Sequence, residues 1–148
     1  LPMPLDAACN PLIVVTRPSN QNACEYAKLS LAVWRARPDA FREFDDWLFA
    51  PANVPALPAA RLKAESLVGK DPLARAINEV WVAAQVRTDV LLYQANARAI
   101  NNGHLPQLML GDAIISGTIN NLEDLLRLVE RHTGLRASLE GKPSGTIP

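Results

Sequence analysis

Two cysteines are the residues of this sequence best suited to covalent chemistry. Cys9 and Cys24 are the only cysteines in the chain and lie 15 positions apart, with two prolines between them. The residues allow three interpretations: two inert buried thiols, a structural disulfide worth roughly 3 kcal/mol for a loop of this size, or a reactive thiolate at Cys24 near the expected start of a helix. The spacing is too long for a C-x-x-C site, and a structural disulfide requires an oxidising compartment.

A second candidate site is the segment 103–108, where Pro106 follows an expected helix end and precedes an apolar strand. Proline is unusual at this place because it removes a hydrogen-bond donor from the strand and must fit a turn. The simpler interpretation is a helix stop. The alternative is a cis proline that keeps the strand edge open for an extended partner, since the cis isomer costs only about 0.5–1 kcal/mol at such a bond.

The remaining residues with chemical potential form weaker patterns. His104 and His132 could join the two cysteines as four zinc ligands, but none of these residues has the spacing of a metal site, so no metal is expected. The chain contains no glycine-rich phosphate loop and no nucleophile elbow, and nothing in it implies a cofactor. The three tryptophans lie among apolar helical positions and are expected in the core, at Trp34, Trp47 and Trp81.

The composition of the chain is that of an ordinary globular domain. It has 148 residues, 49% apolar and 20% charged, with 15 basic and 15 acidic side chains. This predicts one domain with a sizeable core, and zero net charge argues against nucleic acid as a partner. No stretch of apolar residues is long enough to span a bilayer. The N-terminus lacks the features of a signal peptide, so Leu1 is expected to be a processed end or the end of a piece cut from a longer protein.

Proline and glycine positions predict the elements of the first two thirds of the chain. Residues 1–22 contain four prolines and are expected to be an extended segment that could hold an edge strand, followed by a loop. Asn22 and Glu25 resemble a capping box and predict a helix that ends before residue 38. Further helices are expected over 39–49, 62–68 and 72–102, with a proline-rich loop over 51–58. The last helix should break near 87–89, where Thr88 or Asp89 could cap a new start.

The last third of the chain predicts a hairpin and a helix. Residues 107–110 and 113–116 are apolar and flank Gly111 and Asp112, which is typical of two strands joined by a tight turn. Asn121 predicts the start of a final amphipathic helix, and Gly134 predicts its end. Residues 140–148 are expected to form a loose tail.

Several short motifs occur in a characteristic order along this chain. They are Pro4-Leu5, Cys9-Asn10, Ala23-Cys24 with Ala27, the aromatic-rich stretch from Phe41 to Phe49, and Gly103 with Pro106 before the strands. In this order they resemble thioredoxin-like domains of the DsbA type, and most closely those fused to bacterial vitamin K epoxide reductase homologues. The resemblance covers residues 2–135. It implies an α/β, mostly helical domain over residues 1–139, a partial or variant thioredoxin-like fold with a helical insert over 23–102.

The resemblance also implies roles for individual residues. Pro106 would be the cis proline at the start of 103–135, Leu105 would touch the backbone of a substrate, and Cys9 with Cys24 would form an accessory structural disulfide. The family's opening strand, its C-x-x-C and the helix that follows are not matched. Without that dithiol the chain cannot exchange thiols by the usual route, so no catalytic residue is assigned. A C-x-x-C is expected upstream of Leu1 in the encoded protein.

The function that the resemblance implies is that of a domain or fragment of an extracytoplasmic thiol-disulfide oxidoreductase. It would act in the bacterial periplasm or on the outer face of a membrane, on protein or peptide thiols and with a membrane-embedded redox partner. A second copy could pair with an exposed sheet edge. Two alternatives are a redox-inactive thioredoxin-like module that binds peptides or assembles subunits, and a plain helical interaction domain with a trans bond at Pro106 and no sheet.

Overall fold

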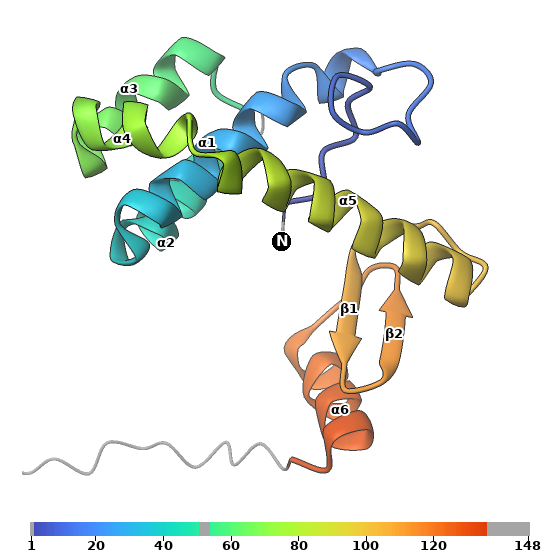
Figure 1. Cartoon of the computed structure of the whole chain (residues 1–148). Coiled ribbons are helices and arrows are strands. Elements are labelled where there is room, and N and C mark those ends of the chain that lie inside the picture. Colours follow the sequence, from blue (N-terminus) through green and yellow to red (C-terminus); the bar gives the residue numbers. More distant parts are fainter. Residues whose placement is uncertain (1, 51–53, 136–148) are drawn as a thin grey trace, which may run out of the picture. The chain divides into compact units, whose positions relative to one another are not determined.

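The computed structural model describes residues 2–50 and 54–135 (Figure 1). Over these residues the chain is mostly helical with one small antiparallel sheet of two strands. The elements are a 3-10 turn, η1 (Pro18–Asn20), then α1 (Ala23–Ala36), α2 (Pro38–Phe49), α3 (Leu57–Val68), α4 (Lys70–Ile77), α5 (Val80–Ala99), β1 (Gln107–Leu110), β2 (Ala113–Ser116) and α6 (Leu122–Thr133). The chain divides into two compact units, Leu1–Tyr93 and Gln94–Pro148. The expected tail over 140–148 lies outside the described residues.

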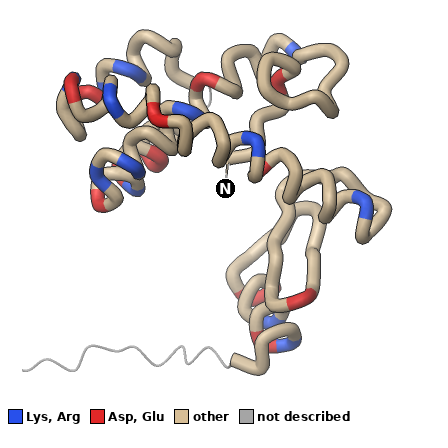
Figure 2. The backbone as a smooth tube through the Cα atoms, viewed as in Figure 1, with Lys and Arg blue, Asp and Glu red and all other residues tan. Residues whose placement is uncertain are grey.

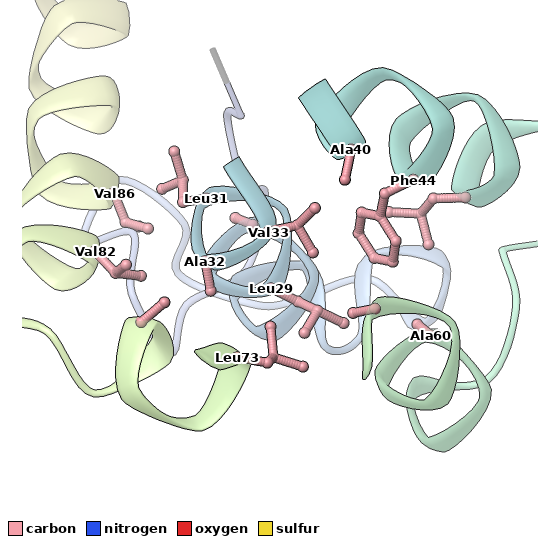
Figure 3. Close-up of a cluster of buried hydrophobic side chains, with 14 residues drawn as sticks. Leu29, Leu31, Ala32, Val33, Ala40, Phe44, Ala60, Leu73, Val82 and Val86 are labelled. Atoms are coloured by element: carbon pink, nitrogen blue, oxygen red, sulfur yellow. The ribbon is translucent and has the colours of Figure 1, made fainter. Parts of the chain in front are cut away.

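The core of the first unit forms around α1. Successive side chains from Leu29 to Val33 are all buried, which is typical of a helix enclosed by others rather than one lying on a surface. Helices α2, α3 and α4 and the first turns of α5 supply the buried side chains that surround it (Figure 3). Ala32, Ala40 and Ala60 are buried at these contacts, and their small side chains let the helices approach closely.

Aromatic rings stack at two places in this unit. Phe44 of α2 is completely buried, and its ring stacks on Trp47 with 6.3 Å between the centroids. The rings of Trp34 and Trp81 stack at 5.3 Å, yet Trp34 remains 42% exposed. The prediction of a core position is therefore wrong for Trp34, because near the C-terminal end of α1 its ring is only partly covered.

The break in the long helical stretch lies earlier than predicted. Helix α4 ends at Ile77 and α5 begins at Val80, and between them the side-chain amide of Asn78 donates to the carbonyl oxygen of Ala74 at 2.8 Å. The predicted break near 87–89 is wrong. Thr88 donates its hydroxyl to a carbonyl oxygen one turn back, at 3.0 Å, so its side chain is satisfied inside the helix and caps no new start.

Asp89, the other predicted cap, is buried in the middle of α5. Its side chain is 4% exposed. One carboxylate oxygen accepts a hydrogen bond from the amide of Gln85 at 2.8 Å, and the other has no partner among the described residues. Burial raises the pKa of this carboxyl group, and the bond from Gln85 offsets only part of the rise. Asp89 is thus an ionisable group inside the first unit and not a helix terminus.

The N-terminal segment also departs from the prediction. Residues 2–22 form turns, bends and the short η1, and contain no strand, so the expected edge strand is wrong. Four prolines and a set of side-chain hydrogen bonds favour turns over an extended backbone here. Asn22 occupies the N-cap position of α1 with a φ of 65°, and its side chain makes no capping bond. Glu25 pairs instead with Lys28 at 2.7 Å, so the predicted capping box does not form.

The first residues of two helices, α3 and α4, also differ from the prediction. Helix α3 begins at Leu57, with Pro58 in its first turn, where proline is tolerated because that N–H would lack a helical acceptor. The proline-rich loop predicted over 51–58 is therefore shorter, and residues 51–53 of it lie outside the described part of the chain. Helix α4 begins at Lys70, so Asp71 lies in the first turn rather than at the cap.

In the second unit, β1 and β2 form the predicted hairpin. Leu110 lies opposite Ala113 next to the turn, and Gln107 lies opposite Ser116 at the far end. Gly111 has a φ of 60° in the two-residue turn, the left-handed value that type II′ turns require at their first central position and that glycine adopts without strain. The local sequence therefore determines both the length of the turn and the register of the strands.

Helix α6 contacts β1. Asn121 caps it as predicted, since its side-chain oxygen accepts a hydrogen bond from the N–H of Asp124 at 2.8 Å. Gly134, with a φ of 71°, ends it. None of the side chains of α6 is fully buried, and the apolar ones at Leu125 and Leu126 are half-buried.

Candidate functional site

The structure joins Cys9 to Cys24 in a disulfide, with 5.9 Å between the two Cα atoms. Because these are the only cysteines in the sequence, the chain in this state carries no free thiol. Cys24 is the second residue of α1 and is buried. The bond therefore ties the turn-rich N-terminal segment to the central helix of the first unit, and neither the inert-thiol nor the reactive-thiolate interpretation describes this state.

Asn10, next to Cys9 in the sequence, stabilises the N-terminal segment through buried hydrogen bonds. Its side chain is completely buried. The amide group donates to the carbonyl oxygen of Pro4 at 2.8 Å, and the amide oxygen accepts the N–H of Leu12 at 3.0 Å. The Asn10 side chain thus provides hydrogen bonds to backbone groups that precede and follow Cys9 in the sequence. These bonds explain why a polar side chain can be completely buried here.

Asp6 forms a second set of hydrogen bonds in the N-terminal segment. One carboxylate oxygen accepts hydrogen bonds from the N–H of Ala8 at 3.0 Å and from the hydroxyl of Thr16 at 3.1 Å, and that hydroxyl oxygen in turn accepts the N–H of Ala7 at 2.9 Å. The bond from Ala8 lowers the pKa of Asp6 more than burial raises it, and Thr16 adds to the lowering. The ionised carboxylate is therefore the form that the fold stabilises.

Changing Asp6 to asparagine is expected to reduce the acid sensitivity of the first unit. A carboxyl group whose pKa is lowered on folding stabilises the protein above its unfolded value of 3.8, and the contribution is lost as pH falls through the lower folded value. Asparagine keeps the acceptor oxygen but has no charge to lose. Urea unfolding followed by tryptophan fluorescence, at about pH 7 and about pH 2.5, should show a smaller drop in stability for D6N than for the original chain.

A matched control for this experiment is Asp112→Asn. Asp112 is exposed in the hairpin turn of the second unit, whereas all three tryptophans lie in the first. D112N should retain the acid dependence of the original chain. An identical acid dependence for D6N and the original chain would contradict the role given to Asp6.

The second candidate site lies at the start of β1. The peptide bond between Leu105 and Pro106 is cis, and Leu105 is exposed. The carbonyl oxygen of Pro106 accepts the N–H of Gly117 at 3.0 Å, and the hydroxyl of Ser116 donates to the carbonyl oxygen of His104 at 2.8 Å. Both bonds join the turn before β1 to β2. A trans bond at Pro106 without a sheet, as the plain helical alternative required, is not what the structure contains.

The pairing of the strands leaves one edge of β1 open. In a hairpin with a two-residue turn, the pair next to the turn is hydrogen-bonded and the pairs then alternate, and the bond between Gly117 and Pro106 continues that alternation. The backbone N–H and C=O of Gln107 and Met109 therefore point away from β2. No other strand pairs with them within residues 2–50 and 54–135.

Gln107 is a residue of this site that sequence reasoning missed. Its side-chain nitrogen is buried and has no hydrogen-bond acceptor among the described residues. A buried amide without a partner is uncommon in folded proteins. No pattern in the sequence distinguishes Gln107 from any other polar residue at the start of a strand, so only the structure identifies it.

The disulfide leaves neither cysteine as a thiolate, so in this state the two cysteines are not metal ligands alongside His104 and His132. His104 precedes β1 and His132 lies in the last turn of α6, whereas the disulfide belongs to the first unit. Over the described part of the chain, no group of three or more His, Cys, Asp or Glu side chains is arranged to hold a metal ion.

Among the described residues, every helix is too short or too polar to cross a bilayer. Basic and acidic residues are interspersed along the helices (Figure 2).

Comparison of the chain with protein-family models, with curated proteins and with solved structures finds no match. The site is therefore defined by its own geometry. The first unit holds a disulfide-closed, hydrogen-bonded loop, and the second holds a short hairpin with an open strand edge next to Leu105 and Pro106.

Proposed function

We propose that this chain is a domain of an extracytoplasmic thiol-disulfide oxidoreductase, and that its second unit provides the edge that binds the substrate. The supporting observation is the arrangement of residues 103–135. The turn at Leu105 and Pro106 leads directly into β1, the outer edge of β1 is unpaired among the described residues, and α6 contacts the same strand. This is the order of elements in the last part of the thioredoxin-like domains that the sequence resembles.

In this proposal an extended segment of the substrate lies beside β1 as an added strand. The outward N–H and C=O groups of Gln107 and Met109 hydrogen-bond with its backbone, so binding depends little on the sequence of the substrate. The exposed side chain of Leu105 provides an apolar contact at the end of the edge. The arrangement suits protein and peptide substrates in extended conformation, such as chains that have not finished folding.

The reacting dithiol in this proposal is a C-x-x-C outside these 148 residues. A substrate thiolate attacks one sulfur of the oxidised C-x-x-C and forms a mixed disulfide, while the other sulfur leaves as a thiolate. A second substrate thiolate then attacks the mixed disulfide, which gives an oxidised substrate and a reduced C-x-x-C. A membrane-embedded redox partner would reoxidise the dithiol. The disulfide between Cys9 and Cys24 only stabilises the scaffold and is consistent with an oxidising compartment.

A second candidate function is a redox-inactive module that uses the same edge to hold a peptide or a second copy of the chain. The observation that favours it is that both cysteines of the sequence are joined to each other. Binding at the β1 edge would then be the whole activity. An insulin-reduction assay on the longest natural chain containing these residues separates the two candidates: turnover supports the oxidoreductase, and saturable peptide binding without turnover supports the binding module.

Changing Met109 to proline is expected to abolish strand addition at β1. Proline removes the outward N–H and places its ring at the edge, while the hairpin survives because Met109 and Ile114 form a pair without hydrogen bonds between them. Loss of one backbone hydrogen bond together with the steric block should lower turnover, or peptide affinity for a binding module, by at least about tenfold. The M109A variant keeps the N–H and should lose much less.

The matched control is Ile114→Pro, which makes the same change on the outer edge of β2. If substrates add to β1, I114P retains activity to within about twofold, a change worth roughly 0.4 kcal/mol. Equal losses in M109P and I114P, or no loss in either, would contradict the assignment of the β1 edge. Far-ultraviolet circular dichroism of each variant verifies that the fold is retained.

A further inference from the structure

A groove of about 460 Å³ opens on the first unit between α1, the first turn of α3 and the C-terminal end of α4. This volume lies within the range of small-molecule sites, roughly 300–1,000 Å³. Its lining is predominantly apolar with one charge of each sign, and consists of Glu25, Leu29, Leu57, Pro58, Arg61 and Ile77. The groove belongs to the first unit, whereas the proposed substrate edge belongs to the second, so the two are separate features of the chain.

The walls of the groove are held by contacts that do not depend on a ligand. Leu29 is 2% exposed and belongs to the core around α1. The hydroxyl of Tyr26 donates to the carbonyl oxygen of Pro55 at 2.7 Å and so attaches the segment before α3 to α1. Lys63 of α3 pairs with Glu43 of α2 at 2.8 Å. The groove is thus formed before any ligand arrives, which lowers the entropic cost of binding.

The two charges of the groove differ in their partners. The carboxylate of Glu25 is neutralised by Lys28 at 2.7 Å. The side chain of Arg61 is exposed and forms no ion pair or hydrogen bond with another described residue. The uncompensated charge beside the apolar surface is therefore a guanidinium, whose planar donors match the two oxygens of a carboxylate.

We infer that this groove binds a small amphipathic carboxylate, with an apolar body against Leu57, Pro58 and Ile77 and its carboxylate on Arg61. Charge complementarity favours an anionic head group, since Arg61 repels a cation and a neutral head leaves the charge of the guanidinium uncompensated. The apolar lining selects a hydrocarbon body over a sugar or a nucleotide, because burying hydroxyl groups there would leave them without hydrogen bonds.

The test is a titration of the isotopically labelled chain with octanoate, followed by amide chemical shifts. Octanoate should bind saturably, with the largest shifts at Leu57, Arg61 and Ile77. The R61Q variant should bind about fivefold more weakly, as expected for loss of one solvent-accessible ion pair. The matched control is Arg75→Gln on α4, which removes an exposed arginine outside the groove and should leave the affinity unchanged.

Octanol provides the comparison that separates charge recognition from simple apolar adsorption. It should bind more weakly than octanoate to the original chain and equally to the original chain and to R61Q. The inference is overturned if octanol binds as tightly as octanoate, if R61Q and R75Q behave alike, or if the shifts fall outside the groove. The result is independent of thiol exchange, so it stands or fails separately from the proposed function.

Discussion

Replacing Phe44 with alanine is expected to lower the free energy of unfolding of the first unit by about 3–5 kcal/mol, the usual cost of removing a buried phenylalanine ring. Phe44 of α2 is completely buried in the core of the first unit, and its ring stacks on Trp47. Buried side chains of the same core surround Phe44, so removing the ring leaves a cavity as well as losing apolar burial. Urea unfolding followed by tryptophan fluorescence measures this loss, since all three tryptophans lie in the first unit.

The control for this variant is Phe44→Leu, which keeps most of the apolar volume and should cost much less, on the order of 1.5 kcal/mol. If F44A and F44L were destabilised equally, the stabilisation would come from the aromatic contact with Trp47 and not from filling the core. A loss below about 1 kcal/mol for F44A would contradict the position of Phe44 at the centre of the unit.

Removing the disulfide is the second change with a large expected effect. The double variant C9S/C24S should lose roughly 3 kcal/mol of stability, because the unfolded chain regains the freedom that a closed loop of this length had removed. The buried Asn10 and the Asp6 network would still hold the loop. The variant should therefore keep the native fold and unfold at a lower urea concentration.

A reducing agent provides the internal control for the disulfide. It should bring the original chain close to the stability of C9S/C24S and leave the double variant unchanged. Mass spectrometry of the oxidised chain after alkylation should find no modified cysteine. Two alkylated cysteines, or a stability that does not respond to reductant, would contradict a structural disulfide between Cys9 and Cys24.

The hairpin and α6 could be predicted closely because their determinants are local. Gly111 and Asp112 specify a two-residue turn, and a turn of that length fixes the register of both strands. Asn121 and Gly134 mark the two ends of α6 through a side-chain cap and a positive φ. In each case the residues that decide the structure lie within a few positions of it.

The errors in the first unit concern features that burial and individual side-chain hydrogen bonds decide. The sequence offers Thr88 or Asp89 as the cap of a new helix start, but the fold buries Asp89 within α5, where it accepts a hydrogen bond from Gln85. The sequence predicts an extended segment followed by a loop over residues 1–22, yet Asp6, Asn10 and Thr16 hold this region in turns through hydrogen bonds between residues up to ten positions apart. Such bonds leave no periodic signal in the sequence.

The residues of the candidate sites also differ in whether the sequence alone can point to them. Cys9, Cys24 and Pro106 can be selected from residue type and order in the sequence, and the structure joins the two cysteines and makes the Leu105–Pro106 bond cis. Gln107 and Arg61 cannot, because what distinguishes them from other polar residues is a side chain without a partner in the described part of the folded chain.

The described part of the second unit lacks a buried apolar core. Among residues 94–135, no apolar side chain is fully buried, in contrast to the first unit. A two-stranded sheet with a partly covered helix has little intrinsic stability, so its backbone opens more readily than the helices around α1. In the proposed function, a substrate strand paired with β1 would bury apolar surface that the hairpin alone exposes to water. The second unit would then become more ordered as more of the β1 edge is occupied by substrate.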